Sequence, residues 1–339
     1  MRAVVFLGQE ELEVQERPDP IPDEGEVLMK VEACGICGSD LHAYKTGMYA
    51  PGLVIGHEFG GVVQAVGTGV TDFRPGDRVT ADSCIGCGSC LLCRNGRENL
   101  CEQSVRLGVT DDGGMAELVK APGSGVYHIP DSLSLKEACL AEPFSITLHG
   151  LNLSRFKPGN RVLIMGAGPI GLCLIQVLKM AGAGSVWITE TSPFRRDLAA
   201  HLGADLVLNP KAVSPLSTVS SLTDGTMADI VFECAGLPQT ITQAPMLVRR
   251  GGQVVILGIC DQPVETDFLS MITSEVDIQT AYYSRASEFA TTIDLMAKGS
   301  LKANRMLTSE VPLERVKESF ETLLSPDGNQ VKILVCPAL

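Results

Sequence analysis

The sequence Arg161-Val-Leu-Ile-Met-Gly166-Ala-Gly168-Pro-Ile-Gly171 joins a short apolar run to a glycine-rich turn, and an apolar segment continues beyond it. This order predicts a strand over 161–165, a turn of the form G-x-G-x-x-G and a helix over 170–180. Gly166 permits the tight turn, Gly168 lets the backbone approach a dinucleotide pyrophosphate, and Gly171 lets the helix lie close to the sheet. The pyrophosphate then accepts N–H bonds at the helix N-terminus. The residues predicted to bind it are Gly166, Gly168, Pro169, Ile170 and Gly171.

Outside this motif, two different patterns of apolar segments divide the chain. Its length of 339 residues suits two domains. Short apolar runs separated by turn signals make the part before about residue 147 rich in β-structure. From about residue 155, short apolar strands alternate with helical segments, which predicts an α/β domain with a parallel, doubly wound sheet. After about residue 285, two helical stretches lead to a last apolar strand over 331–335.

Glu190 ends the strand that follows the glycine-rich turn, 19 residues beyond Gly171. A carboxylate at this point accepts hydrogen bonds from the adenosine ribose hydroxyls and repels a 2′-phosphate, so the sequence favours NAD over NADP. Arg195 and Arg196 follow soon after and could tolerate a phosphate, which keeps NADP as the alternative cofactor. The alternative without a cofactor is an ordinary βαβ unit whose glycines serve packing alone.

A cluster of four cysteines lies within the glycine-rich segment 84–101. The spacing is C-x2-C-x2-C-x7-C, formed by Cys87, Cys90, Cys93 and Cys101. Four thiolates can close tetrahedrally on Zn²⁺ and leave no open position, so the pattern predicts a structural zinc that holds a loop. An iron–sulfur cluster and a redox dithiol are the alternatives.

A second set of candidate metal ligands is spread along the chain and consists of Cys37, His57, Glu58 and Glu142. Thiolate, imidazole and carboxylate give mixed ligation with one position left for water or substrate, which is the open arrangement of a catalytic zinc. Each residue alone is unremarkable, because a lone histidine is more often a core or surface residue than a ligand. The sequence does not rank the two carboxylates.

Composition excludes several classes of protein. Lys and Arg total 27 against 40 Asp and Glu, and the net charge of −13 argues against binding to nucleic acid or to an anionic membrane. The start of the chain lacks the pattern of a signal peptide, so we expect the 12 cysteines to be reduced or metal-bound in a cytoplasmic protein. The uncharged stretch 162–178 contains the glycine-rich turn, so we expect no membrane span.

The order of these motifs resembles the zinc-containing medium-chain dehydrogenase/reductase superfamily, which includes the alcohol dehydrogenases, over essentially the whole chain. The resemblance rests on Cys34–His42, Gly56–Glu58, the four-cysteine segment and Gly166–Gly171. Glu142-Pro143 is similar to the branch of polyol (sorbitol-like) and threonine dehydrogenases. The resemblance implies a GroES-like β-barrel catalytic domain over 1–147 and 285–339, with an inserted Rossmann NAD-binding domain over 148–284.

The resemblance also implies roles for the metal-site residues. Cys37 and His57 carry over as ligands of a catalytic zinc, Glu58 and Glu142 compete for the remaining place, and Asp40 orients His57. The implied catalytic residues are Ser39, which contacts the substrate oxygen, His42, which passes the proton towards solvent, and Glu142. The implied structural zinc lies in the four-cysteine segment, so each chain is expected to hold two zinc ions.

Further cofactor contacts are expected near the ends of later strands of the Rossmann domain. They are assigned to Arg195, Cys234, Leu257 and Gly258. The Phe-Arg-Tyr element common near the substrate in sorbitol dehydrogenases is absent, and Ala281-Tyr-Tyr-Ser-Arg285 stands there. Arg285 could meet a phosphate or carboxylate of the substrate, or pair with surface acids.

The implied reaction is the oxidation of a secondary alcohol of a polyol, sugar alcohol or cyclitol to a ketone, with hydride transfer to NAD. An alternative keeps the mechanism and changes the substrate to L-threonine or 2,3-butanediol. An alternative of another class is a non-catalytic NAD-binding redox sensor, which would need none of the catalytic residues. The superfamily often forms dimers or tetramers, so a homodimer or homotetramer is expected.

Overall fold

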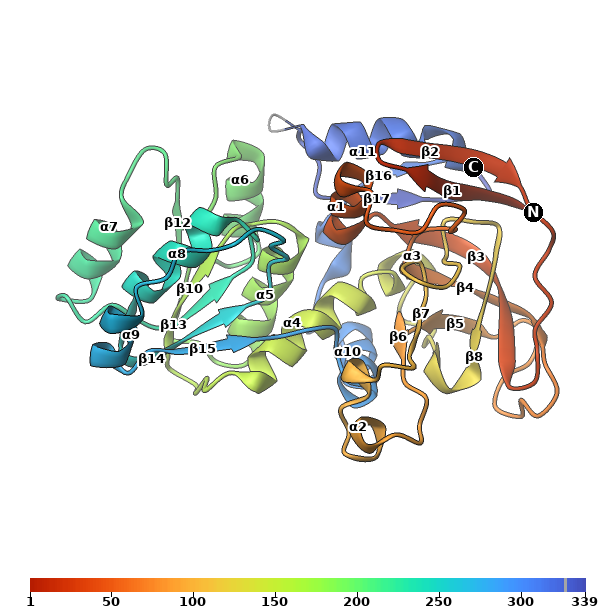
Figure 1. The fold of residues 1–339 in the computed structure, drawn as a ribbon, viewed down its shortest axis with the longest axis horizontal. Helices are drawn as coiled ribbons and strands as arrows, with labels where there is room; N and C mark the ends of the chain where they lie inside the picture. Colours follow the sequence, from red (N-terminus) through yellow and green to blue (C-terminus); the bar gives the residue numbers. More distant parts are fainter. Residues whose placement is uncertain (326–327) are drawn as a thin grey trace. The chain divides into compact units, whose positions relative to one another are not determined.

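The computed structural model describes residues 1–325 and 328–339, which divide into two compact units (Figure 1). Met1–Ser145 and Tyr283–Leu339 form the first unit, and Ile146–Tyr282 forms the second. The second unit therefore interrupts the first in the sequence, and both ends of the chain contribute to one unit.

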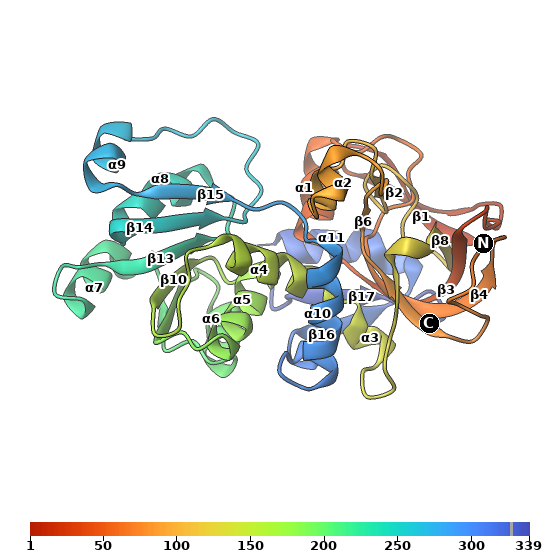
Figure 2. The ribbon, with the colours of Figure 1, turned by 90° about the horizontal axis from the view of Figure 1, so that it is seen from below.

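The second unit is built around a six-stranded sheet with the order β12-β11-β10-β13-β14-β15, in which all neighbouring strands are parallel. Helices lie against both of its faces (Figures 1 and 2). The strands are β10 (Arg161–Met165), β11 (Ser185–Thr189), β12 (Leu206–Leu208), β13 (Ala228–Glu233), β14 (Val248–Ile256) and β15 (Asp277–Thr280). The helices are α5 (Pro169–Met180), α6 (Pro193–His201), α7 (Pro215–Leu222), α8 (Pro238–Leu247) and α9 (Phe268–Ser274). This arrangement confirms the predicted parallel, doubly wound sheet.

The order of the strands reverses between β10 and β13, which lie next to each other although two other strands separate them in the sequence. In doubly wound sheets, ligands bind outside the carboxyl ends of the strands at such a switch point. The glycine-rich turn follows β10 at this point. Any cofactor site in this unit is therefore expected between the turns that follow β10 and β13.

The glycine-rich turn has the packing that its sequence predicts. Gly166 has a φ of 99°, in the left-handed region that favours glycine. A Cβ on Gly171 would collide with the carbonyl oxygen of Gly166, so only glycine lets α5 lie this close to the turn. The helix begins at Pro169, one residue earlier than predicted, because proline is well suited to the first helical position. Among the described residues, no helix is long and apolar enough to cross a membrane.

The first unit contains a seven-stranded sheet with the order β16-β17-β3-β4-β5-β9, in which β8 also pairs with β3. Its strands are β3 (Glu26–Gly35), β4 (Glu58–Val66), β5 (Arg78–Ala81), β8 (Leu118–Pro122), β9 (Val126–His128), β16 (Leu307–Val311) and β17 (Lys332–Val335). Two further pairs are β1 (Arg2–Gly8) with β2 (Glu11–Glu16), and β6 (Cys84–Ile85) with β7 (Val105–Arg106). The predicted β-rich character of the first part of the chain is therefore confirmed.

Helices of the first unit are short and mostly connect strands. They are α1 (Gly38–Thr46), α2 (Leu91–Arg94), α3 (Leu135–Ala138), α10 (Ala286–Ala297) and α11 (Val316–Leu324), and α4 (Ala141–Leu153) begins in this unit and continues into the second. The described residues also form the 3₁₀ turns η1 (Glu98–Leu100), η2 (Gly123–Gly125), η3 (Ala303–Arg305) and η4 (Leu313–Arg315). The two helical stretches predicted after residue 285 correspond to α10 and α11.

The last strand of the chain lies beside the third. In the antiparallel pairing of β17 with β3, Leu334 lies opposite Gly35 and Val335 lies opposite Cys34. All four residues of β17 are buried, although the first of them is Lys332. β17 therefore lies between β16 and the end of β3, just before the first candidate metal ligands begin.

Candidate functional site

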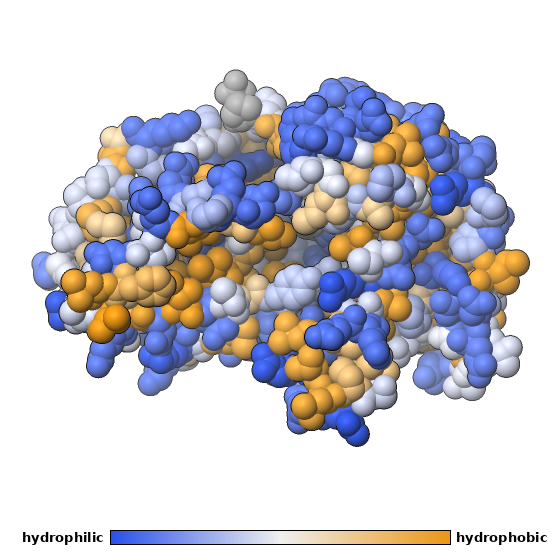
Figure 3. Space-filling view, in the orientation of Figure 1, coloured by the Kyte–Doolittle hydropathy of each residue, from blue (hydrophilic) through white to orange (hydrophobic). Residues whose placement is uncertain are grey.

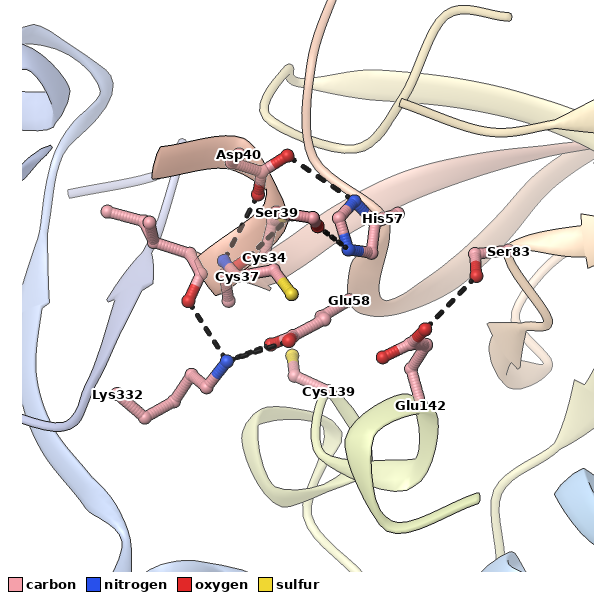
Figure 4. Close-up of polar contacts among 12 residues, drawn as sticks. Cys34, Cys37, Ser39, Asp40, His57, Glu58, Ser83, Cys139, Glu142 and Lys332 are labelled. Carbon is pink, nitrogen blue, oxygen red and sulfur yellow. Dashed lines mark hydrogen bonds and ion pairs between the residues drawn. The ribbon is translucent and has the colours of Figure 1, made fainter. Parts of the chain in front are cut away.

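Cys37, His57 and Glu58 come together at one end of the first unit. Cys37 is the N-cap of α1, directly after β3, and Glu58 begins the neighbouring strand β4. One ligand atom from each of the three side chains lies within 4.8 Å of the others (Figure 4). A thiolate, an imidazole and a carboxylate at these separations can surround a single metal ion.

The imidazole of His57 is held from both sides. Its Nδ1 lies 3.4 Å from Oδ1 of Asp40, and its Nε2 lies 3.2 Å from Oγ of Ser39. The other oxygen of Asp40 accepts a hydrogen bond of 3.1 Å from the backbone N–H of Cys37. Burial lowers the pKa of His57, but the charges of Asp40 and Cys37 outweigh it and raise the pKa well above its usual value. A cation at Nε2 would satisfy the same negative charges, so these residues fit a bound zinc.

Glu58 forms a buried ion pair with Lys332, and both side chains are 0% exposed. Nζ of Lys332 lies 2.7 Å and 2.5 Å from the two carboxylate oxygens, and it also donates to the carbonyl oxygen of Ile36 at 2.9 Å. Gly35 makes this arrangement possible, because a Cβ there would collide with the carboxylate. Lys332 therefore neutralises one of the two candidate carboxylate ligands.

Glu142 lies in the first turn of α4 and is also buried. One of its oxygens accepts a hydrogen bond of 3.3 Å from Oγ of Ser83. Figure 4 shows its carboxylate directed toward the space that the Cys37, His57 and Glu58 side chains surround. Burial raises the pKa of Glu142 to about 7. Two carboxylates thus approach the same space, and only Glu58 is paired with a buried lysine in the described part of the chain.

Ser39, His42 and Tyr49 lie on or just after α1, beside the candidate metal site. His42 is half-buried on the helix, and Ser39 is the member that contacts His57. Tyr49 is buried next to Ser39, and burial raises the pKa of its hydroxyl. The sequence analysis missed Tyr49, because a single tyrosine in a loop carries no motif. It also missed Lys332 and Ser83. A lysine inside the apolar run 331–335 was a usable signal, since buried lysines require a partner.

The four-cysteine segment forms a compact lobe around α2 and η1. Its Sγ atoms lie 4.0 Å apart for Cys87 and Cys93, and 3.8 Å apart for Cys90 and Cys101. Four sulfurs placed about 2.3 Å from one zinc ion form a tetrahedron whose edges are about 3.8 Å long. A disulfide would need about 2.05 Å between the sulfurs. The donor set and its spacing therefore fit one tetrahedral zinc.

Contacts of residues 284–286 connect this lobe to the beginning of α4. A carboxylate oxygen of Glu98 accepts a hydrogen bond of 2.7 Å from the backbone N–H of Ala286. Oγ of Ser284 lies 2.8 Å from Oγ of Ser145, which donates to the carbonyl oxygen of Glu142 at 2.7 Å. The lobe and the helix turn that carries Glu142 are thus attached to the same short segment.

In the second unit, Glu190 lies against the glycine-rich turn. Its Oε2 accepts a hydrogen bond of 2.9 Å from the backbone N–H of Ala167. Its Oε1 accepts hydrogen bonds of 2.7 and 2.8 Å from the backbone N–H groups of Thr191 and Ser192. Arg195 has a buried Nε without a hydrogen-bond partner among the described residues. The carboxylate and the turn that the sequence assigned to one cofactor are therefore neighbours.

The other residues assigned to the cofactor lie at the carboxyl ends of β13 and β14. Cys234 follows β13 and donates its backbone N–H to the carbonyl oxygen of Met165 at 2.9 Å. Leu257 and Gly258 follow β14 and donate to the carbonyl oxygen of Glu233 at 2.8 and 3.0 Å. These residues thus share the sheet edge where β10 ends.

Asp82 is a buried acid, and we expect it to make the stability of the protein depend on pH. Burial raises its pKa to about 7, against about 3.9 in an unfolded chain. The folded state holds the proton more tightly, so the free energy of unfolding falls as pH rises from about 4 to about 7. Asp82→Asn cannot ionise and keeps the oxygen that accepts from the N–H of Cys84. We expect the variant to be more stable than the wild type by about 1–3 kcal/mol at pH 8 and little different at pH 4.

Thermal unfolding followed at pH 4, 6 and 8 tests this expectation. Asp131→Asn is the matched control, because Asp131 is exposed. The control should follow the wild type at each pH. A stability difference for Asp82→Asn that does not change with pH would contradict the assignment.

Known proteins resemble the chain in both sequence and structure. Residues 23–131 match the alcohol dehydrogenase GroES-like domain, and residues 169–298 match the zinc-binding dehydrogenase family. A sorbitol dehydrogenase of Bacillus subtilis is 34% identical over 99% of this chain and 97% of its own length. An L-threonine 3-dehydrogenase of Bacillus licheniformis is 34% identical over 94% of each. A zinc-binding dehydrogenase from Sinorhizobium meliloti, solved bound to NADP, superposes with a TM-score of 0.92 at 33% identity over 99% of each chain.

Proposed function

Because the chain belongs to the zinc-binding, GroES-like alcohol dehydrogenase family, we propose that it transfers a hydride between NAD and a secondary alcohol of a polyol, sugar alcohol or cyclitol. Membership confirms the predicted superfamily, the GroES-like and Rossmann fold class, and an oxidoreductase that uses zinc and a nicotinamide cofactor. The cluster of Cys37, His57 and Glu58 carries the proposal, since a binding protein without catalysis would not need it. The proposed ketone product follows from the loss of hydride from a secondary alcohol.

We assign Cys37 and His57 as ligands of the catalytic zinc, with Glu142 as the carboxylate ligand at rest. Lys332 supports this choice, because it engages both oxygens of Glu58. Glu58, which Lys332 already pairs, would be the second carboxylate within reach of the zinc. The four cysteines of the lobe are assigned to the structural zinc, so metal analysis should find about two zinc ions per chain.

When bound, the zinc supplies Lewis acidity for the substrate hydroxyl, and the nicotinamide accepts the hydride. Ser39 is assigned to accept the hydroxyl proton at Oγ, and its position beside Nε2 of His57 supports this role. His42, one helical turn further along α1, is assigned to pass that proton to solvent. Asp40, whose Oδ1 lies 3.4 Å from Nδ1, is assigned to orient the imidazole, which leaves Nε2 for the metal.

NAD is proposed as the preferred cofactor because the Glu190 carboxylate lies beside the glycine-rich turn. A 2′-phosphate would meet this negative charge, so we expect kcat/KM with NAD to exceed that with NADP by about tenfold or more. Glu190→Ala should narrow the preference by raising the value for NADP. Asp197→Ala is the matched control, since it removes another carboxylate, one that is exposed on α6. Higher kcat/KM with NADP in the wild type would overturn the proposal.

A screen of NAD reduction identifies the substrate. Its arms are polyols, inositols, sugar phosphates, L-threonine and vicinal diols. The proposal expects the highest kcat/KM in the polyol or cyclitol arm, whereas activity with L-threonine or 2,3-butanediol alone would favour the alternative substrates. If none of these compounds supports NAD reduction, the result would favour a non-catalytic redox sensor. Nε of Arg285 is buried without a hydrogen-bond partner among the described residues. The sugar phosphates should therefore be tested with both the wild type and Arg285→Gln.

We propose that the protein works in the cytoplasm as a homodimer or homotetramer, with neither nucleic acid nor a membrane as partner. The net charge of −13 supports the exclusion of both polyanions. Edge strand β15 exposes Ile278, and nearby α9 exposes Phe268, Leu269 and Ile272. Figure 3 shows apolar side chains gathered in this part of the second unit. Light scattering of the purified protein should give a dimer or tetramer mass, and Ile278→Lys should lower it.

A further inference from the structure

Glu233, the last residue of β13, has a fully buried carboxylate that the proposed reaction does not use. Its Oε1 accepts hydrogen bonds from the backbone N–H groups of Ala235 at 2.9 Å and Gly236 at 3.0 Å, and from the hydroxyl of Thr240 at 2.8 Å. Its Oε2 accepts a longer bond of 3.2 Å from Gly236. One buried carboxylate thus holds the turn after β13 and the first turn of α8.

The turn that follows β14 is hydrogen-bonded to the backbone of the same residue and lies against its carboxylate. The backbone N–H groups of Leu257 and Gly258 donate to the carbonyl oxygen of Glu233. A Cβ on Gly258 would lie 2.5 Å from Oε2 of Glu233 and would collide with the backbone nitrogen of Gly236. No side chain fits between the turn after β13 and the turn after β14, so their relative position depends on Glu233, which lies beneath them.

The glycine-rich turn after β10 packs against this assembly. A Cβ on Gly166 would lie 3.0 Å from Cβ of Ala235 and 3.1 Å from its backbone nitrogen. That nitrogen is one of the donors to Glu233. β10 and β13 are the two strands at the switch point of the sheet, with Met165 opposite Glu233. Glu233 therefore lies beneath all three turns at the edge where a dinucleotide is expected.

We propose that Glu233 is a positioning residue for the dinucleotide, because its carboxylate fixes the turn after β13, against which the turns after β10 and β14 pack, before the cofactor arrives. The inference rests on the proposed use of a nicotinamide dinucleotide. A buried ionised acceptor is stable only while its donors stay in place, so it penalises open arrangements of these turns. A turn that is already ordered contributes less entropic cost to binding. Burial raises the pKa of Glu233. The hydrogen bonds from Thr240, Gly236 and Ala235 act in the opposite direction, because they stabilise the ionised carboxylate.

Two substitutions of Glu233 separate the contacts from the side-chain volume. Glu233→Gln keeps an oxygen at the position that accepts three of the four bonds, whereas Glu233→Leu keeps a similar volume and accepts none. We expect the dissociation constant for NAD to rise about tenfold or more in Glu233→Leu and to stay within about threefold in Glu233→Gln. Calorimetry on the zinc-loaded protein, without substrate, gives these constants.

A matched control distinguishes positioning from loss of stability. Val219→Ala removes methyl groups from a fully buried site on α7, in the core of the same unit, and touches none of the three turns. It should lower the melting temperature and leave the dissociation constant for NAD unchanged. Hydrogen exchange of the amides of Ala235 and Gly236, measured without cofactor, should be faster in Glu233→Leu than in Val219→Ala of equal melting temperature.

The outcomes decide the inference in each case. An unchanged dissociation constant in Glu233→Leu, or equal amide exchange in both variants, would overturn it. If Glu233→Leu does not fold, the double variant Glu233→Gln/Thr240→Val replaces it and should raise the dissociation constant more than threefold, whereas an unchanged value overturns the inference. Wild-type protein that binds neither NAD nor NADP would refute the proposed cofactor and the positioning of a dinucleotide with it. Amide exchange would then still report whether the carboxylate orders the turn.

Discussion

Replacing Lys332 by methionine is expected to lower the free energy of unfolding by about 3–5 kcal/mol and to leave little dehydrogenase activity. The substitution keeps the apolar stem but removes the cation that engages both oxygens of Glu58, and both side chains are fully buried. An uncompensated carboxylate then remains in the interior beside Cys37 and His57, where it would compete with the substrate for a bound zinc. Equilibrium unfolding in urea and steady-state kinetics of the zinc-loaded protein measure the two effects.

Three further variants interpret the result. Lys332→Met combined with Glu58→Gln removes both charges and should recover much of the lost stability. Lys332→Arg keeps the charge and should retain more activity than Lys332→Met. Lys136→Met is the matched surface control, because Lys136 pairs with Glu310 at 2.6 Å while remaining partly exposed, so about 1 kcal/mol or less is expected. Equal losses in Lys332→Met and Lys136→Met would refute the importance of the buried pair.

The second large effect is expected from Glu142→Ala, which should lower kcat by on the order of 100-fold or more. The proposed zinc ligand is lost, while Cys37 and His57 remain and Glu58 is still engaged by Lys332. We also expect the catalytic zinc to be lost more readily to a chelator, with the structural zinc retained. Kinetics with the substrate found in the screen, and zinc content after dialysis against the chelator, measure both properties.

Comparison with Glu58→Gln assigns the carboxylate ligand. If Glu142 is the resting ligand, Glu58→Gln should keep its zinc, whereas Glu142→Ala should not. Near-normal activity and zinc content in Glu142→Ala would instead leave Glu58 as the ligand. Glu24→Ala removes an exposed carboxylate from a turn that is distant in sequence from Glu58 and Glu142. It should behave as the wild type in both assays.

The predictable parts of the site are those whose residues are close together in the sequence. The glycine-rich turn can be recognised from six consecutive residues, and the four cysteines lie within fifteen residues. Their chemistry needs a local loop, so spacing alone predicts which residues meet. The doubly wound sheet was predictable for a related reason, because alternating strands and helices allow few other arrangements.

The parts that escaped prediction depend on contacts between distant segments. Lys332 meets Glu58 across 274 positions of the chain, and Ser83 meets Glu142 across 59. No local pattern encodes such pairs, because the pairing of β17 with β3 decides the first of them. Glu233 is a different case, since its sequence neighbours suggested a cofactor turn but could not show that the carboxylate lies beneath three turns at once.

The pairing of the last strand with β3 has a consequence for how the protein is made. Every strand of the second unit lies between residues 161 and 280, so that unit can fold on the ribosome while the C-terminal segment is still being synthesised. The first unit must wait, because Lys332 and the strand beside Cys34 and Gly35 follow the second unit in the sequence. A nascent chain therefore reaches the cofactor-binding fold before it can complete the catalytic metal site.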